Sequence, residues 1–205
     1  MKVLAINGSP HENGSTNAAL SIMKQELIKK EIDVNVFHIG TAPIRGCIGC
    51  RSCADTKKCI YNDDKVNEAI NLLSDIDGLI IASPVHFSGI AGGLKCFLDR
   101  LFFAAGGRVL EYKAASSFVV LRRSGGSAAL DQLNHYLMYS KMVIASSHYW
   151  NILHGTNAQE IYKDEEGVQI IKQAARNLAW LMKSIENSKI DYPQTDERVR
   201  TNFIR

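Results

Sequence analysis

Residues 2–17 read KVLAINGSPHENGSTN, and this stretch decides the fold. Residues 2–7 form a short apolar run that a Gly-Ser-Pro turn closes, which predicts a buried strand. From Thr16 to Lys30 the apolar residues recur at helical spacing, so the polar loop after the strand opens a helix. A buried strand, a hydroxyl-rich loop and a helix in this order predict the first unit of a parallel α/β sheet.

The same alternation continues along the chain. Further strands are predicted at residues 32–39, 78–82, 117–121 and 143–146. Helices are predicted at residues 64–74, 92–105 and 168–185, with another that ends near residue 139. We therefore expect an α/β fold: a doubly wound sheet of five parallel strands with helices on both faces. We expect one domain over residues 1–187 and a C-terminal tail over residues 188–205.

Composition narrows the class of protein. The chain has 205 residues, of which 46% are hydrophobic and 22% charged, enough to bury one core. A net charge of +3 gives little support for nucleic-acid binding. The apolar runs of about five residues are far below the roughly 20 needed to cross a bilayer, and the N-terminus does not fit a secretory signal. We expect a cytoplasmic protein that binds neither nucleic acid nor membranes.

In a doubly wound sheet the ligand lies past the carboxyl ends of the strands, where the strand order reverses. The loop over residues 8–16 opens a helix, whose unpaired N–H groups and dipole suit a phosphate. Three hydroxyl side chains, Ser9, Ser15 and Thr16, and the amide of Asn17 surround that end of the helix. The spacing matches neither G-x-G-x-x-G nor the P-loop, so the pattern favours a monoester phosphate bound without magnesium. An ordinary helix cap is the alternative.

Two further loops follow predicted strands. The loop over residues 83–91 presents the aromatic pair His86 and Phe87 and then small residues, which let a flat ring approach the backbone. The loop over residues 122–127 adds two arginines and then the small residues Ser124, Gly125 and Gly126. Together the loops predict a platform for a flat ring beside the phosphate site. Loops that cap the core and carry solvated arginines are the alternative.

These loops resemble the flavodoxin-like fold, and within it the NAD(P)H-dependent FMN reductases and iron-sulfur flavoproteins. The resemblance covers most of the chain and is carried by residues 7–17 (NGSPHENGSTN), 83–87 (SPVHF) and 94–100 (LKCFLDR). It implies an enzyme in which FMN accepts hydride from NADH or NADPH and passes electrons to a small acceptor. A non-enzymatic electron carrier with FMN and an iron-sulfur cluster is one alternative. A thiol redox or zinc-binding module without flavin is another.

The resemblance also implies site residues. The FMN phosphate is expected at Ser9, Ser15, Thr16 and Asn17, with His11 standing where the family often has arginine. The isoalloxazine ring is expected among Pro84, Val85, His86 and Phe87, together with Ser124, Gly125 and Gly126. Position 86 is commonly tyrosine in the family. No catalytic acid or base is assigned, because the flavin ring carries the chemistry. The family also implies a homodimer or homotetramer.

Four of the five cysteines lie close together, on a loop over residues 46–62 after the second predicted strand. They are Cys47, Cys50, Cys53 and Cys59. Three thiolates in series can hold one [4Fe–4S] cluster, with the fourth ligand returning from a short loop. Structural zinc sites usually pair two separated C-x-x-C units. The iron-sulfur flavoproteins have a similar motif at this place, so a [4Fe–4S] cluster is predicted, with zinc or free redox-active thiols as alternatives.

Overall fold

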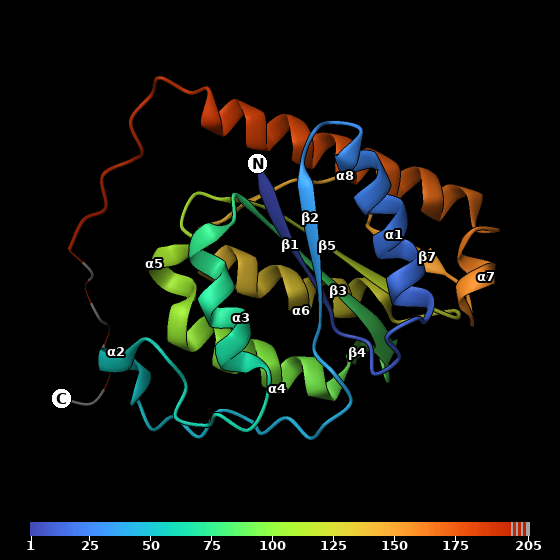
Figure 1. Ribbon diagram of the computed structural model, residues 1–205. Coiled ribbons are helices and arrows are strands. Elements are labelled where there is room, and N and C mark those ends of the chain that lie inside the picture. The colour runs from blue at the N-terminus through green and yellow to red at the C-terminus, as the bar shows by residue number, and fades with distance from the viewer. Residues whose placement is uncertain (198, 200, 202, 204–205) are drawn as a thin grey trace.

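The computed structural model describes residues 1–197, 199, 201 and 203, with the side chains of residues 106 and 108 left out (Figure 1). Its strands form one seven-stranded sheet. The strands are β1 (Lys2–Asn7), β2 (Asp33–His38), β3 (Gly78–His86), β4 (Gly89–Ile90), β5 (Ala114–Leu121), β6 (Val143–Ile144) and β7 (Ile152–His154).

The order of the sheet is β2-β1-β3-β5-β6, and all these neighbours are parallel. The chain moves from β1 outward to β2, then returns to the other side of β1 and continues through β3 and β5. The order therefore reverses between β1 and β3, and this is the switch point at which ligands bind in such sheets. The expected doubly wound α/β class is confirmed.

Helices connect the strands. They are α1 (Ser15–Ile28), α2 (Cys53–Thr56), α3 (Val66–Leu72), α4 (Gly92–Leu101), α5 (Gly107–Val109), α6 (Gly126–Tyr139), α7 (Ala158–Ile161) and α8 (Glu165–Glu186). A 3₁₀ turn, η1 (Leu73–Asp75), follows α3, and a π-helical turn, η2 (Phe102–Gly106), follows α4. Within the described residues, no helix has both the length and the apolar character needed to cross a membrane.

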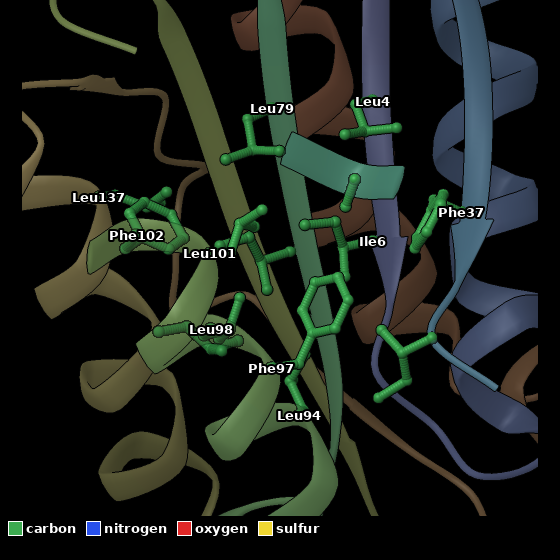
Figure 2. Close-up of a cluster of buried hydrophobic side chains, with 14 of the residues drawn as sticks. Leu4, Ile6, Phe37, Leu79, Leu94, Phe97, Leu98, Leu101, Phe102 and Leu137 are labelled. Atoms are coloured by element: carbon green, nitrogen blue, oxygen red, sulfur yellow. The ribbon is translucent and has the colours of Figure 1, made fainter. Parts of the chain in front are cut away.

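Alternate side chains of each strand build two cores, one on each face of the sheet. In β1, Leu4 and Ile6 pack with α3, α4 and α6. Val3 and Ala5 pack on the other face with α1 and α8. Figure 2 shows the first core, where side chains of α4 approach Leu4, Ile6 and Leu79 of the strands. Both faces of the sheet are therefore covered, as the apolar strands require.

The far edge of the sheet differs from the prediction. The fifth predicted strand, residues 143–146, pairs with β5 only over the two residues of β6. The chain then leaves the edge and returns as β7, which pairs with β5 again further along. Periodicity does not reveal strands this short, so β7 and the two-residue β4 were missed.

Residues 192, 193 and 195 of the C-terminal tail contact the turns that precede β5 and β6. Tyr192 stacks on Tyr112 with ring centroids 5.0 Å apart, and the Tyr112 hydroxyl donates to the Pro193 carbonyl over 3.4 Å. The helix before the tail, α8, ends at Glu186. The boundary between residues 187 and 188 as a domain limit stays a prediction.

Candidate functional site

A cleft of about 560 Å³ opens past the carboxyl ends of β1, β3 and β5. Four segments line it: residues 9, 11 and 13–16 of the first loop and the start of α1, residues 84–85 of β3, residues 120–122 at the end of β5, and residues 155–159 from the end of β7 into α7. The cleft therefore lies at the switch point of the sheet, where the sequence places its phosphate loop.

The first loop is braced by its own side chains. The buried Asn7 accepts the backbone N–H of Ser9 over 3.1 Å and donates to the Glu12 carbonyl over 3.3 Å. The Ser9 hydroxyl accepts the backbone N–H of His11 over 3.0 Å. Ser9 is 4% exposed, so part of its hydrogen-bonding capacity already shapes the loop. This bracing holds the loop in a fixed conformation at the start of α1.

The N-terminus of α1 is open to the cleft. Gly14 precedes the helix without a side-chain cap, and the first turn has no acidic residue. Among the described residues, nothing accepts a hydrogen bond from the backbone N–H groups of residues 15–17. Ser15 and the buried Thr16 line the cleft, whereas Asn17 and its side chain lie outside the lining. These donors and the positive end of the helix dipole form a site for an anion.

The loop after β3 is a tight hairpin. Val85 pairs with Ile90 and His86 with Gly89, which leaves Phe87 and Ser88 as the two turn residues. Their φ angles are +51° and +60°, a conformation that residues other than glycine adopt at a cost. Pro84 and Val85 line the cleft, while His86 is exposed and Phe87 is fully exposed at the tip. Strained backbone of this kind gathers at functional sites.

The loop after β5 touches this hairpin. Gly125 has a φ of +87°, and a Cβ atom there would lie 2.6 Å from the Ser88 Oγ and 2.7 Å from its Cα. Ser124, Gly125 and Gly126 line a neighbouring cleft of about 380 Å³ that shares Leu121 with the first. The structure thus brings the second and third predicted loops together, although not all their residues face one cavity.

We expect Gly125→Ala to destabilise the protein by about 1–3 kcal/mol, because an added Cβ clashes with the Ser88 backbone and the positive φ disfavours alanine. Chemical denaturation measures this change. Gly93→Ala in α4 is the matched control, since a Cβ there meets nothing within 4 Å. Equal stability of the two variants would show that the hairpin and the loop after β5 do not depend on this contact.

The segment over residues 155–159 was missed from the sequence. It comprises the link after β7 and the first two residues of α7, and it lines the same cleft as the first loop. Asn157 caps α7 by accepting the backbone N–H of Glu160 over 3.0 Å. An Asn followed three residues later by Glu is a helix-start signal, and this pair was the available sequence cue.

The four clustered cysteines line one pocket, together with Arg100 of α4 and residues 103–104 of the π-helical turn. All four are free thiols: Cys47 and Cys50 are exposed, and Cys53 and Cys59 are half-buried. Burial is the largest cause of a raised pKa at the Cys53 thiol, and the three neighbouring thiols add to it. The four cysteines, which are close together in the sequence, therefore also lie close together in the structure.

Two buried side chains fix the fourth cysteine. Asn67 of α3 accepts the backbone N–H of Cys59 over 2.8 Å and donates to its carbonyl over 2.9 Å. Arg100 donates from Nε to the Cys59 Sγ over 3.1 Å and forms an ion pair with Asp64. Burial alone lowers the pKa of Arg100, but its hydrogen bonds to Asp64 and Cys59 raise it above the ordinary value.

By their chemistry, four cysteine thiolates suit either an iron-sulfur cluster or a zinc ion. Within the described residues, no group of three or more His, Cys, Asp or Glu side chains is spaced to hold one metal ion. A zinc tetrahedron is therefore not preformed. In a cubane each thiolate binds a different iron, so the sulfurs need not converge on one atom. The space between the side chains is about 20 Å³, and residues 39–52 have no helix or strand to resist widening it.

The cleft and the cysteine pocket share no lining residue. Figure 1 shows the cysteine segment leaving β2 and turning away from α1 toward α2. Arg100, which lines the cysteine pocket, lies near the C-terminal end of α4. It is roughly 12 Å along the helix from Gly92, the first residue of α4, which follows the hairpin that borders the cleft. Substitutions in one site can therefore be tested for effects on the other.

A family model described as NADPH-dependent FMN reductase matches residues 1–157. The chain belongs to this FMN reductase family. It is an oxidoreductase of the NAD(P)H-dependent FMN reductase type, and the residues matched include the first loop, the hairpin, the cysteine segment and the loop after β5.

Relatives of this FMN reductase family member include proteins named iron-sulfur flavoproteins. An iron-sulfur flavoprotein of Methanocaldococcus jannaschii is 25% identical over 193 residues, covering 91% of this chain and all of the relative. Another from Clostridioides difficile is 28% identical over 149 residues, covering 72% of this chain and 66% of the relative. Among solved structures, an NADH:FMN oxidoreductase in its apo form has a TM-score of 0.63 at 20% identity, covering 92% of this chain and 91% of the other.

Proposed function

We propose that the protein binds FMN in the cleft past β1, β3 and β5, takes hydride from NADH or NADPH, and passes electrons on to an acceptor. The observation that carries the proposal is the uncapped N-terminus of α1, which opens into a cleft at the switch point of the sheet. Membership of the FMN reductase family supports the same assignment.

The residues of the cleft divide into two groups in this proposal. The N–H groups of residues 15–17 and the hydroxyls of Ser15 and Thr16 bind the phosphate. Arg122 lines the same cleft and supplies positive charge, in a site where His11 stands instead of arginine. Pro84 and Val85 support the ring, and the hairpin tip beyond them borders it. Bound FMN supplies the hydride acceptor, while the protein orients it and sets the local charge.

We also propose that Cys47, Cys50, Cys53 and Cys59 hold one [4Fe–4S] cluster. Their shared pocket and the names of the relatives support this ligand set. In this proposal Cys53 and Cys59 are the two ligands held by α2 and by the buried side chain of Asn67, and Cys47 and Cys50 are the two on irregular chain.

Anaerobic purification tests the proposal directly. Heat denaturation should release FMN, identified by chromatography, and rapid mixing with NADH or NADPH should bleach the flavin absorbance. Release of FAD alone, or no flavin uptake under saturating FMN, would overturn the flavin assignment. A flavin that neither nucleotide reduces at a useful rate would indicate an electron carrier instead of a reductase. Cell fractionation tests the cytoplasmic location that belongs to the same proposal.

A homodimer or homotetramer is expected because large aromatic side chains stand exposed at the neighbouring cleft beside the loop after β5. Tyr149 and Trp150 are 58% and 54% exposed and meet edge to face at 4.5 Å. In the tail Phe203 is also exposed, while Ile204 lies outside the described residues. Light scattering at micromolar concentration measures the mass. A monomer would contradict the expectation, and Trp150→Glu should reduce the mass if this surface forms the contact.

A further inference from the structure

Arg100 is a charged residue buried in the interior, and none of its hydrogen bonds serves the flavin cleft. Its side chain is 1% exposed, and the Asp64 side chain that pairs with its Nη1 is 2% exposed. A charge buried this deeply is tolerated only when it is paired and its donors are satisfied. The hydrogen-bond partners of Arg100 therefore indicate its role.

Most of these partners belong to the chain on either side of the cysteines. Nη1 donates to the Arg45 carbonyl over 3.3 Å, just before Cys47, and Nη2 to the Tyr61 carbonyl over 3.2 Å, just after Cys59. Asp64 follows at the end of the same segment. These contacts tie both ends of the cysteine segment to α4, and they use only the two terminal nitrogens of the guanidinium.

The remaining donor has a different partner. Nε donates to the Cys59 Sγ over 3.1 Å. A neutral thiol accepts hydrogen bonds weakly, whereas a thiolate or a metal-bound sulfur carries negative charge and accepts a charge-assisted bond. Asn67 holds the backbone of Cys59 on both sides, so its sulfur stays in front of Nε. A cluster-bound Cys59 sulfur would therefore accept a stronger hydrogen bond from this donor than a free thiol does.

The contact acts through a directed N–H and not through net charge. Asp64 neutralises Arg100 at close range, so the field at Cys59 is dominated by the dipole that points at it. Hydrogen bonds to cluster sulfurs are among the factors that set the reduction potential of an iron-sulfur cluster. They favour the reduced form, because the reduced cluster places more negative charge on its sulfurs.

We propose that Arg100 is a positioning residue that orients the Cys59 ligand and raises the reduction potential of the [4Fe–4S] cluster through its Nε–H···Sγ bond. This inference rests on the cluster proposed above. The cluster takes up one electron from the reduced flavin or from another one-electron donor, and no bond is made or broken at Cys59. Arg100 makes that electron easier to accept.

The test compares Arg100→Lys with the parent after anaerobic reconstitution with iron and sulfide. Lysine keeps the positive charge beside Asp64 but lacks the planar fork that reaches the sulfur and the carbonyls together. We expect a potential about 59 mV lower, which corresponds to a tenfold change in the one-electron equilibrium. Arg45→Lys is the matched control: its side chain pairs with the exposed Asp63, lies outside the pocket lining and should leave the potential unchanged.

Asp64→Asn separates this role from a purely structural one. It breaks the same ion pair but leaves Nε facing the sulfur, and it removes a negative charge near the cluster. Because the Nε–H still faces the sulfur, we expect that the potential does not fall as it does in Arg100→Lys, while both variants lose stability. If both variants lose stability and leave the potential unchanged, Arg100 is only a structural anchor and the proposal is wrong.

A measurement on the unsubstituted protein covers the case in which these variants do not fold. Protein grown with arginine labelled by ¹⁵N in the guanidinium group is reduced and studied by pulsed electron paramagnetic resonance. A ¹⁵N coupling to the reduced cluster, retained in Arg45→Lys, supports the proposal, and its absence overturns it. A parent protein that binds iron but lacks the coupling refutes only the role of Arg100. A parent protein that binds no iron refutes the cluster proposal and this one together.

Discussion

Ser15→Glu is expected to weaken FMN binding by about 100-fold or more. Ser15 is the first residue of α1 and lines the cleft, so a carboxylate there stands where we place the phosphate. Two charges of the same sign about 4 Å apart repel by roughly 4 kcal/mol at a protein surface, and about 2.7 kcal/mol already corresponds to a hundredfold change in Kd. Titration of apoprotein with FMN, followed by flavin fluorescence, measures the effect.

Two controls make this result specific to the phosphate. Gln25→Glu places the same charge at an exposed position in the same helix, away from its N-terminus, and should bind FMN like the parent. Riboflavin lacks the phosphate, so Ser15→Glu should bind riboflavin about as well as the parent does. If Ser15→Glu binds FMN as tightly as Gln25→Glu, the phosphate lies elsewhere.

The fold was largely predictable because its decisive residues act locally. The apolar run of β1 and the helical spacing after it are properties of neighbouring residues, and both appear as expected. The interruption of the sheet edge between β6 and β7 is not local. It depends on how the chain leaves β5 and returns to it, which short strands do not encode in their own pattern.

The cleft residues that could be predicted from the sequence are those in loops that follow long strands. Ser15, Thr16, Pro84 and Val85 line the cleft as the loop argument implies. Phe87 belongs to the same predicted loop as Pro84 and Val85 but is fully exposed. It is a residue of the two-residue hairpin turn, which lies beyond the part of β3 that lines the cleft. The turn type follows from the pairing between β3 and β4. Phe and Ser are not the residues that usually mark such a turn, so the sequence carries no signal for it.

Arg100 could not be assigned a role from the sequence. In α4 it follows the charged residue Asp99, and a long charged side chain at such a position usually reaches toward solvent. Its burial depends on Asp64 and on two backbone carbonyls, all contributed by a segment that lies far away in the chain. Contacts of this kind exist only once the cysteine segment has folded over the end of α4.

The largest expected effect concerns the cysteine pocket. The parent chain should take up about four irons on anaerobic reconstitution and absorb broadly near 400 nm beyond the flavin bands. Cys50→Ser and Cys53→Ser should each lose most of this iron, because a serine hydroxyl is a poor substitute for a thiolate ligand. FMN affinity should stay unchanged in both variants, since the cleft and the pocket share no lining residue. Iron analysis and flavin titration on the same samples measure both.

Cys96→Ser is the matched control, because Cys96 is a half-buried thiol on α4 outside the pocket lining. It should retain the full iron content, which shows that loss of iron follows from losing a ligand and not from losing any thiol. If Cys50→Ser and Cys53→Ser hold as much iron as the parent, the ligand assignment is wrong. If the parent holds no iron, the protein is a plain flavin reductase and its cysteine cluster has another role, such as the zinc site or free thiols named above.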